Sequence, residues 1–110
     1  MAALRLGAAA VSVEPGYPTQ VYPQRANIEF VEPVGAHHVR MRVWERGVGE
    51  TFSCGTGTVA AAVAAAAAAG ERTGSWRVDP PGGSLLVELT AEQAHLTGPA
   101  VIVARGKVDL

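Results

Sequence analysis

Charge and cysteine are both scarce in this sequence. Asp, Glu, Lys and Arg make up 17% of the 110 residues, and nine basic against ten acidic residues leave a formal net charge of -1. A chain so close to neutral has no basic surface for nucleic acid, so no nucleic-acid partner is expected. The single cysteine, Cys54, excludes an intrachain disulfide and is compatible with a reducing compartment. We therefore expect a cytoplasmic protein.

Long apolar runs are lacking too. The longest, residues 59–69, is too short to cross a bilayer and consists mostly of alanine, which partitions poorly into lipid. Residues 1–6 carry one basic residue, Arg5, and only a short apolar run precedes Glu14, which is unlike a secretory signal. No membrane association is expected. The length predicts a single domain, residues 1–110, with a modest core.

Most of the chemically informative residues lie in one stretch, residues 45–58, with the sequence ERGVGETFSCGTGT. Gly55 and Thr56 open a predicted helix, whose first N–H groups have no intrahelical acceptor and whose macrodipole is positive at this end. A helix start of this kind suits an anion such as a carboxylate. A thiol placed just before it favours the thiolate, so the pKa of Cys54 is expected to lie below the free value of about 8.5. The stretch predicts a reactive thiol beside a carboxylate-binding site.

The polar candidates also have plain structural interpretations. A lone cysteine is often a small buried apolar side chain, and an asparagine at a strand start, such as Asn27, often satisfies nearby backbone groups. Glu45 and Arg46 can form a solvated ion pair of little energetic value. For Cys54, the flanking glycines and the upstream Glu45 and Arg46 favour the reactive thiol, because a buried filler needs none of them.

Hydrophobic periodicity and turn residues predict the secondary structure. Apolar and polar residues alternate over 26–31 and 38–45, which is typical of strands with one buried face. Alanine, the strongest helix former, fills 56–69, and Gly70 is expected to cap that helix, although biased composition alone can also produce an alanine-rich run. The remaining predictions are a helical start within residues 4–13, a turn at 33–35 and short strands at 76–78, 85–89, 94–97 and 100–104.

The three histidines do not predict a metal site. His37 and His38 are neighbours in a predicted strand, so their side chains point to opposite faces, and no acidic or cysteine cluster lies beside them in the sequence. His95 lies in a short alternating run and is expected at the surface.

The run ERGVGETFSCGTGTVAAAVAA, residues 45–65, resembles the second active-site segment of the diaminopimelate epimerase family. Upstream, Asn-Ile-Glu-Phe at 27–30 resembles the segment in which an asparagine of that family touches substrate. Downstream, Pro-Gly-Gly-Ser-Leu at 81–85 and Leu-Thr-Gly-Pro-Ala at 96–100 resemble its C-terminal end. The pieces occur in the family's order, and the resemblance extends from about Leu6 onward.

The resemblance implies a fold and a reaction. The fold is α+β: a mainly antiparallel sheet, curled toward a barrel around a central alanine-rich helix, as in either half of the family's enzymes. The reaction interconverts LL- and meso-2,6-diaminopimelate, a step of lysine and peptidoglycan precursor biosynthesis, without cofactor or metal. One cysteine removes the α-proton while another returns a proton from the opposite face. Helix N-termini stabilise the charge that spreads onto the substrate carboxylate.

Site residues follow from the same resemblance. Cys54 is implied as one of the two catalytic cysteines. The implied substrate-binding residues are Asn27, Glu45, Arg46, Gly55 and Thr56: Arg46 pairs with the substrate carboxylate, Glu45 helps to hold the amino group, and the amides of Gly55 and Thr56 bind the carboxylate.

The family's other cysteine belongs to an N-terminal half that these residues do not resemble. We therefore expect the C-terminal half of an epimerase that lacks the N-terminal catalytic domain, is inactive alone and forms a homodimer when complete. Three alternatives stay open. The chain can be half of a proline-racemase-like enzyme, although the context of Cys54 favours the diaminopimelate branch. It can be a non-catalytic binding or assembly domain, or a symmetric dimer that brings two copies of Cys54 together.

Overall fold

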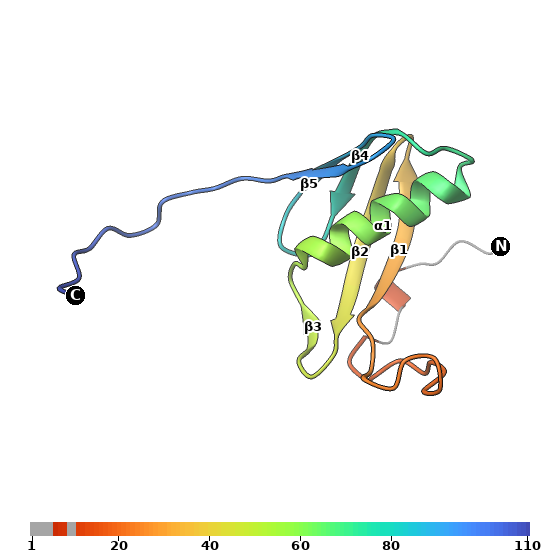
Figure 1. Cartoon of the computed structure of the whole chain (residues 1–110), viewed down its shortest axis with the longest axis horizontal. Helices are drawn as coiled ribbons and strands as arrows, with labels where there is room; N and C mark the ends of the chain where they lie inside the picture. The colour runs from red at the N-terminus through yellow and green to blue at the C-terminus, as the bar shows by residue number, and fades with distance from the viewer. Residues whose placement is uncertain (1–5, 9–10) are drawn as a thin grey trace.

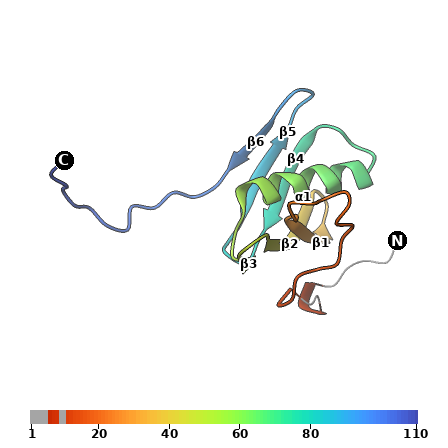
Figure 2. The ribbon, with the colours of Figure 1, turned by 60° about the horizontal axis from the view of Figure 1, so that its bottom comes forward.

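A six-stranded sheet and one α-helix form the body of the protein. The computed structural model describes residues 6–8 and 11–110. The elements in chain order are the 3₁₀ helix η1 (Leu6–Ala8), β1 (Ile28–Gly35), β2 (His38–Glu45), β3 (Gly49–Thr51), α1 (Gly55–Ala68), β4 (Gly74–Asp79), β5 (Leu85–Leu89) and β6 (Ala94–Thr97). The predicted α+β class is confirmed, and α1 lies across one face of the sheet (Figure 1 and Figure 2).

The sheet is open and mainly antiparallel. Its strand order is β1-β2-β4-β5-β6, with β3 paired to β2 off this path. The exception to antiparallel pairing is β2 with β4, where His38 to Arg40 run parallel to Arg77 to Asp79. The other end of β2 pairs with β3, so one edge of β2 serves two strands in succession. The chain passes from the end of β3, at Thr51, to the start of α1, at Gly55, through only three residues.

The helix α1 forms where alanine predicts it. Residues 55–68 consist mainly of alanine, and the helix ends in a left-handed Gly70 with φ of 75°. The N–H groups of Gly70 and Glu71 donate to Ala67 and Ala66 at 3.0 and 2.8 Å, the paired bonds of a Schellman motif. Ala61, Ala62 and Ala66 are buried. Their short side chains let the helix approach the sheet closely.

The core lies between α1 and the apolar face of the sheet. Side chains alternate along each strand, and the buried set faces the helix. This set comprises Val39, Met41 and Val43 of β2, Trp76 and Val78 of β4, and Val87 and Leu89 of β5. On the opposite face, called the far face below, β2 presents Arg40, Arg42 and Trp44. Part of the far face is covered by the N-terminal segment, where Leu6 and Val11 are 3% and 1% exposed.

Several sequence predictions need correction. β1 continues through Pro33 to Gly35 with a bulge near its end, and the turn falls on residues 36–37 instead of 33–35. Pro33 is tolerated because β1 is an edge strand of the sheet. Within 4–13, the described residues show only the turn η1, while residues 1–5 and 9–10 lie outside the description.

The predicted strand at 100–104 is wrong. Residues 98–110 have no regular structure and run away from the body of the protein (Figure 1). A strand needs a neighbouring backbone, and this segment lies against none. Its apolar side chains are therefore exposed: Val101, Ile102 and Val103 are 79%, 67% and 91% accessible.

Candidate active site

Cys54 lies at the boundary between the β3 segment and α1. It is the N-cap residue of the helix, with extended backbone angles (φ −143°, ψ 115°), and its side chain makes no capping hydrogen bond. Its Sγ lies 3.5 Å from Oγ1 of Thr56. The first N–H groups of a helix have no intrahelical acceptor, so those of Gly55 and Thr56 are available to a ligand beside the thiol. Cys54, Gly55 and Thr56 thus lie together at the start of α1, and their predicted roles stay predictions.

Thr58 stabilises this helix start through two hydrogen bonds, and the sequence analysis did not identify it. The Thr58 side chain is fully buried, and its Oγ1 donates to the carbonyl of Cys54 at 2.7 Å. The Thr58 N–H donates to the same oxygen at 2.8 Å. A threonine early in a helix is a recognisable local signal, because its hydroxyl can bond a carbonyl one turn back. Thr58 therefore sets the orientation of the residue that carries the thiol.

The segment before Cys54 is held by the β4–β5 turn. The N–H of Gly82 donates to the carbonyl of Phe52 at 2.8 Å. A Cβ at Gly82 would lie 3.0 Å from that oxygen, so the close approach depends on glycine. The Phe52 side chain itself is 78% exposed. The loop backbone is thus fixed while a large apolar side chain beside the thiol is left uncovered.

Asn27, Glu45 and Arg46 gather at the end of the β2–β3 hairpin. The Arg46 N–H donates to Oδ1 of Asn27 at 2.9 Å, so Asn27 has the local backbone role that is common at strand starts. The Thr51 hydroxyl donates to the Glu45 carboxylate. The Arg46 guanidinium reaches the carbonyl of Gln24 at 3.5 Å. These residues do not contact Cys54, and their predicted substrate roles stay predictions.

Glu29 is a charged residue that approaches the thiol, and the sequence did not single it out. The alternation of Ile28 and Phe30 against Glu29 is confirmed, but it is the Glu29 side that faces α1, in register with buried Val43. A Cβ on Gly57 would lie 2.8 Å from Oε1 of Glu29 and 3.3 Å from Sγ of Cys54. Burial, and then the nearby Glu45 carboxylate, raise the pKa of Glu29 above its usual value. Glu29 thus lies close to Cys54 and is also near enough to Glu45 of the β2–β3 hairpin for the two carboxylates to repel each other.

The two adjacent histidines go to separate carboxylates. Nε2 of His37 lies 2.7 Å from Glu71, and its ring stacks on Trp76 with centroids 4.5 Å apart. Nε2 of His38 lies 2.7 Å from Asp79. No group of three potential metal ligands occurs within residues 6–8 and 11–110. The third histidine, His95, is exposed on β6. In the part of the chain that is described, no helix combines the length and apolar character needed to span a bilayer.

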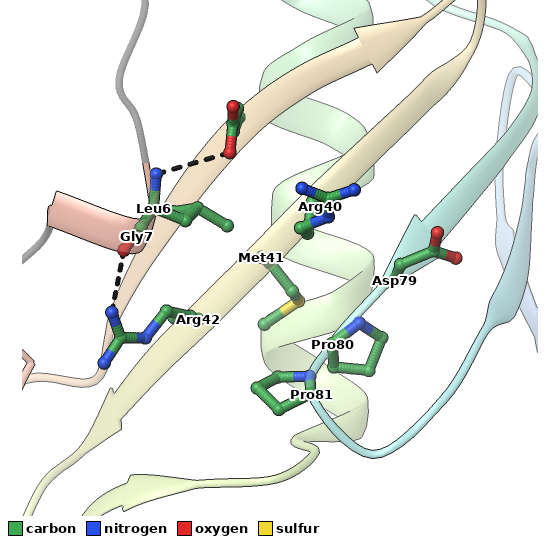
Figure 3. Close-up of a pocket in the computed structure, with 9 residues that line it drawn as sticks. Leu6, Gly7, Arg40, Met41, Arg42, Asp79, Pro80 and Pro81 are labelled. Atoms are coloured by element: carbon green, nitrogen blue, oxygen red, sulfur yellow. Dashed lines mark hydrogen bonds between the residues drawn. The ribbon is translucent and has the colours of Figure 1, made fainter.

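One cavity lies on the far face, and Cys54 is not among the residues that line it. It has a volume of about 400 Å³, and its lining includes Leu6, Arg40, Arg42, Asp79 and Pro81 (Figure 3). Arg42 donates to the Leu6 carbonyl at 2.7 Å across its rim, as the dashed line shows. The described residues that line this cavity include no cysteine, serine or threonine. The half-buried side chain of Cys54 packs instead against the core.

A thiol at an amide-rich helix start can exchange a proton with a carbon acid whose carboxylate is bound by those amides. The open sheet, the helix across one of its faces and the cysteine at the start of that helix together define the class of α+β domain to which this chain belongs. Sequence comparison identifies the family. The family model described as "Diaminopimelate epimerase" matches residues 17–110, and the chain belongs to that family.

Curated relatives agree with this assignment. The chain is 50% identical over 97 residues to a diaminopimelate epimerase of Corynebacterium aurimucosum, covering 88% of this chain and 35% of the relative. It is 44% identical over 109 residues to the Rhodococcus opacus enzyme of that name, covering 99% of this chain and 38% of the relative. For the Mycolicibacterium smegmatis enzyme the identity is 50% over 102 residues, with coverage of 93% and 34%. The chain thus spans about a third of the length of these relatives.

Proposed function

We propose that these 110 residues form one half of a diaminopimelate epimerase active site, with Cys54 as one of its two proton-transferring thiols. The observation that carries the proposal is the position of Cys54, the single cysteine, at the N-cap of α1 in a chain of this family. The reaction is the cofactor-independent interconversion of LL- and meso-diaminopimelate in lysine and peptidoglycan precursor biosynthesis. We place it in the cytoplasm, where a free thiol stays reduced.

The remaining residues act on the substrate in this proposal. The N–H groups of Gly55 and Thr56 bind the carboxylate next to the reacting carbon, where negative charge develops as the α-proton leaves. Arg46 supplies a positive charge for a carboxylate, and its exposed side chain, weakly held by Gln24 at 3.5 Å, is free to turn toward one. Asn27 fixes the backbone of Arg46, and Glu45 receives the amino group.

Inversion needs a second base, because the proton must leave one face of the carbon and return to the other. The chain has one cysteine, so the second thiol must come from another segment or chain. Exposed apolar side chains around the helix start support the binding of such a partner there. Phe52 is 78% exposed. Leu96, which lies 3.5 Å from a Cβ built on Gly55, is 42% exposed. Residues 98–110 offer a further apolar segment for docking.

A mixing experiment tests the proposal. The partner is the part of the Corynebacterium aurimucosum relative that the chain does not match. Each purified piece is expected to leave LL- and meso-diaminopimelate unchanged, and the mixture is expected to interconvert them, as followed by chiral chromatography. Replacing Cys54→Ser in the mixture is expected to abolish the reaction. Interconversion by the chain alone would instead support a symmetric dimer. A mixture that associates but stays inactive would support a non-catalytic assembly domain.

A further inference from the structure

The strongest unexplained feature beside the thiol is the half-buried, helix-facing side of β1. Glu29 lies on the helix-facing side of the strand, two residues before Val31, which packs against the core. A carboxylate at such a position is unusual, because Val31 on the same side of the strand and Val43 across from it are apolar, and Glu45 nearby carries a like charge. Nothing in the fold requires a charge there, since no other described residue forms an ion pair with it.

Gly57 shows how closely this carboxylate approaches the catalytic thiol. Both Oε1 of Glu29 and Sγ of Cys54 lie within 3.3 Å of the place that a Cβ of Gly57 would occupy. The oxygen and the sulfur are therefore at most about 6 Å apart, a separation at which charges interact strongly when partly shielded from water. Gly57 itself is buried and carries no side chain, so nothing of its own separates them.

The charged side chains that act on this point, Glu29 and Glu45, are both negative. α1 contributes no charged residue, only the positive end of its macrodipole. From β2, Glu45 acts on Glu29, and β6 contributes the apolar Leu96. Arg46 lies on the exposed hairpin and reaches Gln24, away from the helix start. The carboxylate of Glu29 thus opposes the helix terminus. α1 has no charged side chain, and the one basic residue of β6, His95, is exposed and lies opposite Glu88 of β5.

We propose that Glu29 is a positioning residue that acts through Cys54: its carboxylate counters the positive end of α1 and strengthens the hold of the thiol on its proton. This inference rests on the proposed function for its meaning in catalysis, because each thiol of a two-base site must be able to act as acid as well as base. A helix start alone would favour the thiolate. With Glu29 beside it, Cys54 retains a proton to return to the carbanion.

The test is the pH dependence of alkylation of Cys54 by iodoacetamide in the 110-residue chain. The thiolate is the reacting form, so the midpoint of the rate profile reports the pKa of the thiol. Replacing Glu29→Gln removes the charge and keeps the shape. The midpoint is expected to fall by about 0.5 to 2 pH units, the range given by a unit charge about 6 Å away in surroundings between water and a partly buried site. An unchanged midpoint would overturn the inference.

The matched control is Glu32→Gln. Glu32 lies on the same strand but on the far face, where it accepts a hydrogen bond from the Leu6 N–H at 3.3 Å. Its replacement is expected to leave the midpoint within about 0.2 pH unit, since the body of the sheet separates it from the thiol. Circular dichroism of each variant shows whether it folds.

A second measurement uses the unmodified chain, so it holds even if Glu29→Gln does not fold. The ¹³C shift of the Cys54 Cβ is followed over the acid range, and a small step is expected where Glu29 titrates, above the usual glutamate pKa of 4.5. A flat response there would contradict the inference. Neither readout needs epimerase activity. A shifted alkylation profile with no activity in the mixing experiment would therefore refute the proposed function alone, and the reverse would refute the role of Glu29 alone.

Discussion

The two faces of the sheet are built from alternate residues of the same strands, yet they differ in burial and in polar contacts. On the helix face, Met41 and Val43 are fully buried beneath α1. On the far face, Arg42 forms a two-bonded ion pair with Glu50, at 2.6 and 2.9 Å, and contacts the Leu6 carbonyl. The comparison teaches that the helix face carries the apolar core and the thiol, whereas the far face carries polar pairs around a cavity.

The largest expected effect on stability comes from the helix face. Met41→Ala removes a side chain with 0% exposure from the centre of the core. The lost apolar contacts and the cavity left behind are expected to lower the free energy of unfolding by about 3 kcal/mol, measured by urea denaturation. The neighbouring far-face variant Arg40→Ala serves as the control and is expected to change it by less than about 0.5 kcal/mol. Similar losses for both would remove the distinction between the faces.

The far face is expected to contribute to folding stability mainly through Asp79, and this contribution is expected to depend on pH. Burial raises the pKa of Asp79, but hydrogen bonds from Arg77, His38 and Ser84 outweigh it and hold the pKa at about 2 against an ordinary 3.8. Since the folded pKa is depressed, the stabilisation is complete above the ordinary pKa and is lost as the pH falls toward about 2. Asp79→Asn is expected to lower stability at neutral pH by about 1 to 2 kcal/mol, after allowance for solvent screening.

Thermal unfolding of the Asp79→Asn variant between acid and neutral pH checks this prediction. The variant is expected to lose the part of the acid sensitivity that Asp79 contributes. Asp109→Asn, in the exposed C-terminal segment, is the matched control and is expected to behave as the unmodified chain. An unaltered pH profile for Asp79→Asn would mean that the far-face network adds no stability.

A smaller effect is expected at the helix start. Thr58→Val removes the hydroxyl that donates to the Cys54 carbonyl at 2.7 Å, while keeping the shape of the buried side chain. The loss is expected to be about 1 kcal/mol, measured by thermal or urea unfolding. Thr97→Val, at an exposed position on β6, is expected to change stability by less than about 0.5 kcal/mol. An equal effect of the two substitutions would argue against Thr58 as the anchor of the thiol segment.

The smallest effect on stability is expected from deleting residues 99–110. Residues 98–110 have no regular structure and are exposed, so the deletion is expected to change the free energy of unfolding by less than about 0.5 kcal/mol. In the mixing experiment, however, the shortened chain is expected to bind the complementary part more weakly, measured by calorimetric titration. Unimpaired binding would show that this apolar segment does not dock there.

The sequence predicted where the helix and the strands lie along the chain better than it predicted how they pack on one another. Alanine propensity and Gly70 located α1, and the alternation of apolar residues located β2, because both signals are local. Alternation also separated Glu29 from Phe30 in β1. It did not reveal that α1 covers the Glu29 side, since that depends on how distant segments pack. The failed strand at 100–104 has the same cause: a strand forms only against a partner, and local propensity does not supply one.

The sequence motif predicted one part of the candidate site, and the structure added another. The glycine-rich motif predicted that Cys54, Gly55 and Thr56 meet at a helix start, and the geometry agrees. The roles of Asn27, Glu45 and Arg46 in binding substrate came from resemblance alone and stay predictions, since Asn27 and Arg46 bond to nearby backbone and Glu45 to the Thr51 hydroxyl. Glu29 carried no local signal, because a glutamate in an alternating strand ordinarily faces solvent.

The most direct test of a half-site with one base is α-proton exchange in deuterated water. The chain, the complementary part of the Corynebacterium aurimucosum relative, and their mixture are each incubated with the two stereoisomers, and deuterium at the α-carbon is followed by NMR. We predict no exchange by either piece and exchange with inversion by the mixture, lost in Cys54→Ser. Deuterium incorporation with inversion by the chain alone, dependent on Cys54, would contradict the account, because it would mean that this chain assembles both bases itself.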